Sequence, residues 1–206
     1  MNPDSNMSDV KVMIEVYSQD LDGVWFGVAC ANQKIVASSF SRNQQLTLRN
    51  ILTIIPFGTP FQVFHQLSAF AKDAFASLKE IYDGENVNVS FPLAFAHLPT
   101  YTQKVLKATF QIPLGYITSY SSISKAVGGG PRAVGNIMAS NPFAPIVPCH
   151  RVVKSDFTLG GYGGGLKVKV ELLSREKRGF SRSKDIQVNG RSLTVFPVEY
   201  ALKRLV

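Results

Sequence analysis

The stretch Ile146-Val147-Pro148-Cys149-His150-Arg151-Val152-Val153 places a thiol beside an imidazole in an otherwise apolar run. Only the thiolate form of cysteine attacks as a nucleophile, and an unassisted thiol titrates near ~8.5. A reactive cysteine therefore needs a neighbouring base, and His150 is the adjacent candidate. Neighbouring side chains on extended backbone point to opposite faces, so we expect His150 to reach the sulfur through a bend or a bridging water. A Cys-His pair alone is equally compatible with core packing, so its surroundings decide the interpretation.

The segments on either side of this stretch narrow the possible functions of the cysteine. Pro142, Pro145 and Pro148 stiffen the backbone that leads to the cysteine, which leaves it little conformational entropy to lose. Downstream, residues 160–165 place five glycines around Tyr162, and backbone N–H groups in such a loop can approach a ligand closely. The loop lacks the Lys-Ser/Thr pair of a phosphate loop and the strand-helix context of a dinucleotide site, so we exclude both.

Two short helices are predicted on either side of Gly128-Gly129-Gly130. Ser119 is placed to cap the first, which runs through Ala126, and Pro131 suits the first position of the second, Arg132–Ala139. Two short helices joined by a glycine-rich turn are typical of a helix-turn-helix, although an ordinary αα-hairpin has the same pattern. Small side chains allow the second helix to approach a partner closely; they are Ala133, Gly135 and Ala139.

Charge divides the chain into two unlike halves. Residues 1–99 hold six Lys/Arg against nine Asp/Glu, whereas residues 100–206 hold sixteen against five, which together give the net charge of +8. A basic excess confined to one half favours a polyanion such as nucleic acid as the partner of that half. A solvated surface that happens to be basic is the alternative.

Length and composition indicate an ordinary globular chain of one large or two small domains. Cys30 and Cys149 lie far apart in unlike contexts, which argues against a disulfide framework and for a reducing interior. No Cys/His cluster has zinc-ligand spacing, so we expect no metal. The first residues are polar and include Asp4 and Asp9, and no apolar run has transmembrane length, so we expect neither a secretory leader nor a membrane partner.

Hydrophobic periodicity predicts a small α/β arrangement in the first half. The expected elements are strands over Val12–Val16, Val24–Ala31 and Lys34–Phe40, a tight turn at Asn32-Gln33, and helices over Gln44–Ile54 and Gln62–Tyr82. Asp83-Gly84 closes the long helix, and an irregular connector follows over about 87–98.

The second half is expected to be mainly helical and to end in a separate tail. Further helices are predicted from Thr102, as the cap, to Phe110 and over Leu166–Lys177. In the tail from Gly179 the expected elements are a hairpin turning at Asn189-Gly190 and a last helix over Val198–Leu205 with Glu199 and Lys203 as an i,i+4 pair.

Several motifs in a fixed order give this chain a resemblance to a known family. They are Ser119-Tyr120, Pro131-Arg132-Ala133-Val134-Gly135, Asn141-Pro142, Pro148–Val153 and Gly161–Leu166. From about Tyr101 to Glu176 the chain resembles the O6-alkylguanine-DNA alkyltransferases, which are methylated-DNA–protein-cysteine methyltransferases. The resemblance implies a ribonuclease-H-like α/β domain with connector over 1–98 and a winged-helix or helix-turn-helix domain over 99–178. A hairpin-helix extension over 179–206 would pack on the core.

The resemblance implies a single alkyl transfer from O6-alkylguanine, possibly also O4-alkylthymine, in double-stranded DNA to the cysteine. An alkyl carbon inside stacked duplex cannot be reached, so the base must leave the stack. The thioether formed is stable, so each molecule would act once. No cofactor is implied, and the protein would be a cytoplasmic monomer, or a nuclear one in a eukaryote.

The resemblance also implies roles for individual residues. Cys149 would accept the alkyl group, His150 would take its proton through a water, and Glu176 would orient His150. Asn141 would brace the turn, and Tyr120 would protonate or hydrogen-bond the leaving guanine and crowd its phosphate. The base would be bound by Val152, Tyr162, Gly163, Gly164 and Met138. Arg132 would fill the vacancy in the stack, and further DNA contacts would come from Ala133, Gly135, Arg151 and Lys169.

The sequence leaves alternatives open. Tyr120 and Tyr162 are also compatible with packing, and Glu176 with a surface helix charge between Arg175 and Lys177. Ala144 stands where some relatives have proline, which would widen the mouth of the pocket. Non-catalytic relatives that bind alkylated DNA lack the cysteine, so Cys149 argues against that class. A cysteine hydrolase would leave the basic half and the helix-turn-helix unexplained.

Overall fold

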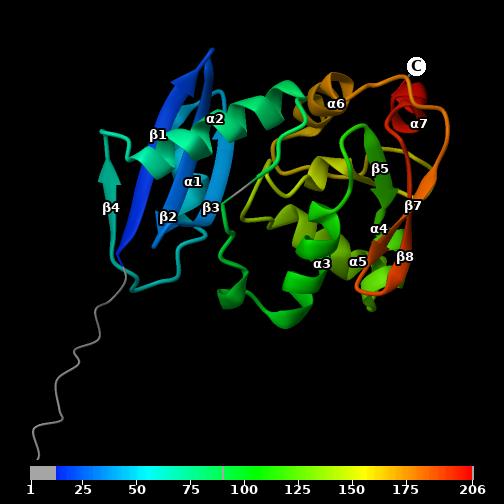
Figure 1. The fold of residues 1–206 in the computed structure, drawn as a ribbon, viewed down its shortest axis with the longest axis horizontal. Coiled ribbons are helices and arrows are strands. Elements are labelled where there is room, and N and C mark those ends of the chain that lie inside the picture. Colours follow the sequence, from blue (N-terminus) through cyan, green and yellow to red (C-terminus); the bar gives the residue numbers. More distant parts are fainter. Residues whose placement is uncertain (1–12, 90, 206) are drawn as a thin grey trace, which may run out of the picture.

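The structure is a computed structural model that describes residues 13–89 and 91–205. Within these ranges the chain forms two four-stranded sheets and seven α-helices (Figure 1). Val12, Asp4 and Asp9, which enter the sequence predictions, lie outside the described residues. No described helix combines the length and the apolar character that crossing a membrane requires.

The first sheet is an antiparallel meander with one parallel edge strand. In the order β3-β2-β1-β4 its strands are Lys34–Ser41, Val24–Ala31, Ile14–Leu21 and Phe61–Phe64. The predicted turn at Asn32-Gln33 is confirmed, with φ of 49° and 56°. Such paired positive φ values are typical of two-residue hairpins whose twist matches the strands. A turn of the same kind at Asp22-Gly23, which was not predicted, joins β1 to β2.

Two helices cover opposite faces of this sheet. Helix α1 (Gln44–Leu52) packs Ile51 against one face, where a β-carbon on Gly27 would lie 2.4 Å from Ile51 Cδ1. Helix α2 (Ala69–Asp83) covers the other face and buries Phe75 and Leu78 with Phe26 of β2. Alternate residues of each strand therefore face different helices, as the pleat requires.

The predicted helix over 62–82 is wrong in its first third. Residues Phe61–Phe64 form β4, where Val63 pairs in parallel with Val16 of β1. The helix begins only after Ser68, whose side chain accepts a hydrogen bond from the Ala71 N–H. Apolar residues at helical spacing did not reveal that the open edge of β1 offers backbone hydrogen bonds to this segment.

The second half is built around the short strand β5, which was not predicted from the sequence. The elements from Pro99 to Glu176 are α3 (Thr100–Phe110), β5 (Tyr116–Ser119), α4 (Tyr120–Val127), α5 (Pro131–Ala139), β6 (Val152–Val153) and α6 (Leu166–Arg175). The predicted cap at Ser119 and the predicted first helical position of Pro131 are confirmed. The cap predicted at Thr102 is wrong, because α3 already begins at Thr100 after Pro99.

The tail is part of the second sheet. Strands β7 (Lys184–Val188) and β8 (Arg191–Pro197) form the predicted hairpin, and the sheet order is β6-β5-β8-β7. Helix α7 (Glu199–Leu202) and a 3-10 turn, η3 (Lys203–Leu205), end the described chain. The expected Glu199–Lys203 pair is replaced, because Glu199 Oε1 accepts a hydrogen bond from the Gly179 N–H at 2.7 Å.

One hydrophobic core runs through both halves. It joins residues of the first sheet and α2 to residues of α3, α4, α5 and α6, and it includes Cys149. Strand β5 is the hub of the second half: Thr118 pairs with Val152 of β6, and Ile117 pairs with Phe196 of β8. The strand that precedes Tyr120 is therefore fixed on one side by the cysteine loop and on the other by the tail.

Candidate active site around Cys149

Cys149 begins a 3-10 turn, η2 (Cys149–Arg151), and not an extended segment. The expectation of extended backbone with side chains on opposite faces is therefore corrected. Asn141 holds the preceding loop at both ends, because its Nδ2 donates to Val147 O at 2.8 Å and its Oδ1 accepts from Phe143 N at 3.0 Å. Proline residues leave few backbone donors here, so the Asn141 side chain supplies bonds that the loop cannot make itself.

The first sheet supports the same loop from the other side. Ser38 of β3 donates its N–H to Pro142 O at 2.8 Å and its hydroxyl to Ala144 O at 3.0 Å. Ser38 is buried and lies about a hundred residues away in the chain, so no local sequence signal connects it with the cysteine. Ser38 was therefore not predicted as a site residue.

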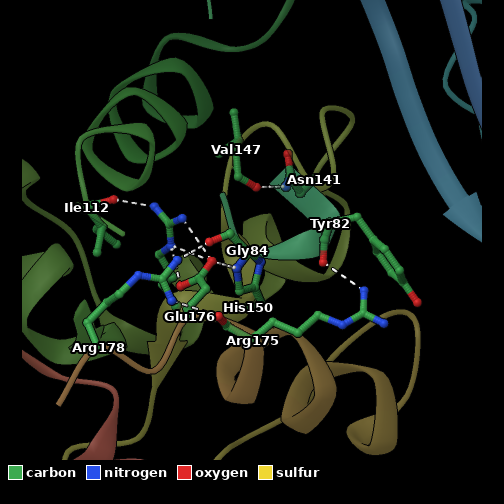
Figure 2. A network of polar contacts seen from close by, with 10 residues as sticks. Tyr82, Gly84, Ile112, Asn141, Val147, His150, Arg175, Glu176 and Arg178 are labelled. Carbon is green, nitrogen blue, oxygen red and sulfur yellow. Dashed lines mark hydrogen bonds and ion pairs between the residues drawn. The ribbon is translucent and has the colours of Figure 1, made fainter. Parts of the chain in front are cut away.

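A buried polar cluster forms around His150, the residue that follows the cysteine (Figure 2). His150 Nε2 lies 2.7 Å from Glu176 Oε1, and Arg151 donates to both carboxylate oxygens of Glu176 at 2.8–3.1 Å. Arg151 Nη1 also donates to Ile112 O at 2.6 Å. Glu176 is 1% exposed, so its interpretation as a surface charge does not fit the structure.

The charges in this cluster determine which groups are ionised. Burial alone would raise the pKa of Glu176, but the neighbouring His150 and Arg151 outweigh it and hold this pKa down at about 2. Burial lowers the pKa of His150, against the opposing effect of Glu176, so the ring is neutral near pH 7. When its Nε2 donates to the carboxylate, Nδ1 keeps a lone pair. Nδ1 is buried and has no hydrogen-bond partner within the described residues.

The Cys149 thiol lies 6% exposed and is protonated at rest. Burial raises its pKa, while hydrogen bonding by the Asn141 side chain and the charge of Lys169 partly offset the rise. The arrangement therefore combines a protonated nucleophile with a neutral imidazole held by a carboxylate. This is the general order of nucleophile, base and orienting group in nucleophilic catalysis.

Two residues expected to contact DNA lie inside the protein, so these predictions are corrected. The Lys169 ammonium donates to Val152 O at 2.6 Å and Leu159 O at 2.5 Å, and burial lowers its pKa to about 8. The Arg151 guanidinium donates its hydrogen bonds to Glu176 and to Ile112 O. A lysine or arginine in a basic half is normally a surface charge, and the sequence alone gave no sign that carbonyls and a carboxylate enclose these two.

The first half of the chain also contacts the segment that carries Glu176. The Arg175 guanidinium lies 4.2 Å from the Tyr82 ring centroid and donates to Tyr82 O at 2.9 Å, and Arg178 donates to Gly84 O (Figure 2). Gly84 has φ of 83°, and a β-carbon there would lie 2.6 Å from Arg175 O. The C-terminal end of α2 therefore packs directly against the C-terminal end of α6. The sequence indicated the helix end at Gly84 but not this contact.

Two clefts meet at Cys149. The first, of about 460 Å³, lies among Tyr120, the helix α5 and the glycine-rich loop; it is lined by Pro131, Gly135, Met138, Lys154, Tyr162 and Gly163 among others. Tyr120 donates its hydroxyl to Gly161 O at a long 3.4 Å, and burial raises its pKa, so it stays protonated. Burial also raises the pKa of Tyr162 well above its usual value. Most of the residues expected to bind the base are thus brought together.

Other predicted residues lie at the margin of this cleft. Arg132 and Ala133 are exposed in the first turn of α5, next to Pro131. Gly164 lines the second cleft, of about 480 Å³, which extends toward the first sheet. Val152 is buried, and its carbonyl accepts from Lys169 with one lone pair, which leaves the other available.

The chain is similar in sequence to proteins named as DNA methyltransferases of one family. Residues 100–178 match the family model described as 6-O-methylguanine DNA methyltransferase, DNA binding domain. Two relatives are named methylated-DNA–protein-cysteine methyltransferase: one from Pyrobaculum aerophilum is 57% identical over 32% of this chain and 44% of its own length, and one from Methanothermobacter thermautotrophicus is 38% identical over 48% and 57%. The chain thus spans about half the length of these curated relatives.

Solved structures extend the similarity to more of the chain. O6-methylguanine-DNA methyltransferase from Pyrococcus kodakaraensis aligns with a TM-score of 0.63 at 27% identity, over 80% of this chain and 99% of its own. Mycobacterium tuberculosis OGT in complex with DNA aligns with a TM-score of 0.64 at 27% identity, over 79% and 92%. The mixed α/β fold, with both of its halves, is therefore shared with these proteins.

Proposed function

We propose that the protein repairs DNA by moving the alkyl group of O6-alkylguanine onto Cys149. The match of residues 100–178 to the family model described as 6-O-methylguanine DNA methyltransferase, DNA binding domain, supports this proposal. The observation that carries the proposal is a thiol at the junction of two open clefts, backed by a neutral His150 whose free nitrogen is buried. The relatives whose names state this activity support it.

The transfer is a single displacement in which a sulfur–carbon bond forms as the carbon–O6 bond breaks. The thiol proton passes through a water to His150 Nδ1, and the imidazolium is stabilised by the ionised Glu176 at 2.7 Å. The guanine leaves with the former C–O bonding electrons, and the protonated Tyr120 hydroxyl donates a hydrogen bond or a proton to it. Lys169 and Asn141 hold the backbone on either side of the sulfur.

The first cleft is where the base would enter from double-stranded DNA. A base must leave the stack before its O6 group can reach a nucleophile inside a protein. Arg132 is exposed at the start of α5 beside this cleft, so we infer that its side chain replaces the extruded base. Ala133 and Gly135 would lie against the groove of the DNA. The similar structure of Mycobacterium tuberculosis OGT in complex with DNA supports DNA as the partner.

We further propose the domain division 1–98, 99–178 and 179–206, with a ribonuclease-H-like first domain and a winged-helix second domain. The meander β1-β2-β3, followed by α1 and by a β4 parallel to β1, supports the first assignment. Helices α4 and α5 support the second, and the hairpin β7-β8 of the extension packs beside β5 of this domain.

The test is incubation with duplex DNA that carries methyl-labelled O6-methylguanine, followed by intact-mass measurement. We expect one methyl group per molecule on the Cys149 peptide, and none in Cys149→Ser. Cys30→Ser is the matched control, because Cys30 is also buried but lies in the first sheet and lines neither cleft. Transfer well past one equivalent or release of free product would overturn the proposal in favour of a hydrolase. DNA binding with no mass gain would overturn it in favour of a damage-binding protein.

A further inference from the structure

The hairpin β7-β8 belongs to the part of the chain to which the proposed function gives no role. The family match ends at residue 178, and the hairpin spans 184–197. Strand β8 pairs with β5 and continues along α4, on the side of the second half that faces away from the first sheet (Figure 1). Its buried residues belong to the main core: Val188, Leu193 and Val195. Covering the core therefore explains one face of the hairpin, but not its exposed end.

The exposed end of the hairpin is held against the C-terminal end of α4. The turn Asn189-Gly190 has φ of 51° and 73°, which is typical of a tight two-residue turn, and Val188 pairs with Arg191 across it. From this position Arg191 Nη1 donates to Lys125 O at 3.3 Å, in the last turn of α4. The bond is favourable because the last carbonyls of a helix lack intrahelical partners. A guanidinium has five N–H donors, so the exposed Arg191 keeps most of them available.

Positive charge gathers at this end of the hairpin without acidic partners. Lys125 and Arg191 are exposed, and so is Arg132 just beyond the turn that joins α4 to α5. Residues 120–139 and 187–192 contain no Asp or Glu. Among residues 13–89 and 91–205, no ion pair involves any of these three cations. Like charges on one surface repel each other, so an anionic partner stabilises them.

The position of this surface decides which anion it meets. Tyr120, the first residue of α4, borders the first cleft, whereas Lys125 and the bound Arg191 lie about 8 Å further along the helix axis. The turn after this end of α4 leads directly into α5, the helix that the proposed function places against the DNA groove. Phosphates line both edges of a groove, and basic side chains that flank a groove-bound element contact phosphates and not bases.

We propose that the hairpin β7-β8 is a second DNA-contacting element, in which Arg191 together with Lys125 binds a phosphate of the duplex away from the extruded nucleotide. This inference rests on the proposed function, because it takes α5 as the helix in the groove. The contact is indifferent to base sequence and to alkylation, since phosphates carry no base information. The tail therefore contributes to holding DNA, and the chemistry stays with Cys149.

The experiment measures the affinity of the full chain for undamaged duplex DNA at a series of salt concentrations. Arg191→Ala should lower the magnitude of the slope of log affinity against log salt by about 0.9. At about 0.1 M salt it should weaken binding by about eightfold, which is the factor that this slope gives between 1 M and 0.1 M. Arg191→Lys keeps the charge and should retain the wild-type slope. Arg204→Ala is the matched control, because Arg204 is an exposed arginine of the same tail, in η3 beyond the other end of β8.

A purely structural role for Arg191 gives a different result. If this arginine only held the end of α4, Arg191→Ala would lower the midpoint of urea unfolding and leave the salt slope unchanged, and the proposal would be overturned. Lys125→Ala tests the same surface if Arg191→Ala folds poorly, and the double variant should lower the slope by about twice as much as either change. Equal slopes in the double variant and the wild type would also overturn the proposal.

Methyl transfer separates this inference from the proposed function. Once the DNA is fully bound, the rate of transfer from O6-methylguanine in duplex should be the same in Arg191→Ala as in the wild type. Slower transfer from bound DNA with an unchanged salt slope would place Arg191 in the chemistry and overturn the phosphate contact. A wild-type protein that binds DNA but gains no methyl group on Cys149 would overturn the proposed function, whereas the salt slopes would still report on the hairpin.

Discussion

The two sides of Cys149 are built in opposite ways. Behind the sulfur, His150, Arg151 and Glu176 form a buried cluster in which both carboxylate oxygens are paired at 2.7–3.1 Å. In front of it, the Tyr120 hydroxyl makes one long bond of 3.4 Å, and Arg132 is exposed. Buried charges require complete pairing, whereas a recognition surface must leave groups available for its ligand. Substitutions behind the sulfur should therefore lower stability as well as alkyl transfer, whereas those in front should alter the reaction with DNA and leave stability unchanged.

The largest effect on the buried side is expected from Glu176→Gln. It removes the negative charge that pairs the buried Arg151 and orients His150. Loss of one partner of a buried ion pair costs about 3–5 kcal/mol, because the other charge stays buried without compensation. We expect a loss of this size in the free energy of unfolding measured with urea, together with loss of alkyl transfer.

The matched control is Glu171→Gln. Glu171 lies on α6, which ends just before Glu176, and pairs with Arg175, but its side chain is 31% exposed. Partly exposed pairs contribute about 1 kcal/mol or less. If the two variants lost similar stability, the buried cluster would not be the stabilising feature that we describe.

Acid should weaken the buried side through the same residue. The pKa of Glu176 is lowered from 4.5 to about 2, so its contribution is fully present above pH 4.5 and is lost as the pH falls toward 2. A difference of this size corresponds to about 3 kcal/mol. His150 acts in the same direction below pH 6.5, because only its unfolded form readily takes up a proton.

Urea unfolding at a series of pH values between 7 and 2.5 measures this dependence. Glu176→Gln should flatten the curve below pH 4.5, since the variant has no carboxyl group to protonate at this site. An unchanged acid slope in the variant would show that other carboxylates are responsible.

The fold was predicted correctly from the sequence where an element depends only on residues within one short segment. The turn at Asn32-Gln33, the cap at Ser119 and the helix start at Pro131 all depend on neighbouring residues. Strands β5 and β6, with four and two residues, are too short for a periodic pattern and exist because they pair with each other. The edge strand β4 depends in the same way on its distant partner β1.

The candidate site was likewise predicted where local motifs identify its residues and not where burial or distant contacts decide. An ordered set of motifs identified Cys149, His150, Glu176, Tyr120 and Asn141, and the structure brings them into one region. Burial could not be predicted from residue type, so Arg151 and Lys169 were placed on the DNA surface although both lie inside. Contacts such as Arg175 with Tyr82 join residues some ninety positions apart, and no local pattern predicts them.

On the open side the largest expected effect follows Arg132→Ala. We expect repair of O6-methylguanine in duplex to slow by about tenfold, since replacing a good DNA contact costs about 1–3 kcal/mol. Reaction with the free modified base should stay unchanged, because no base has to be extruded. Single-turnover rates on both substrates measure the difference, and stability should be unaffected.

Arg49→Ala serves as the control for Arg132→Ala, because Arg49 is an exposed arginine in the half that carries excess acid. It should leave both rates unchanged. Equal slowing on duplex and on the free base would refute base extrusion by Arg132 and place its effect on the chemistry instead.

The smallest effect should come from Lys154→Ala, which tests whether charge on the open side acts separately from base extrusion. Lys154 is exposed and lines the first cleft, so its ammonium is placed to contact a phosphate. Each phosphate contact contributes a slope of about −0.9 to the dependence of log affinity on log salt, whatever the DNA sequence. Removal of Lys154 should therefore lower that slope by about one and weaken binding of undamaged and alkylated duplex alike, with transfer from bound DNA unchanged. Lys72→Ala, an exposed lysine on α2, should leave the slope unaltered. A variant at Lys154 that lost transfer without a change in salt dependence would assign this lysine to the chemistry and refute its role as a phosphate contact.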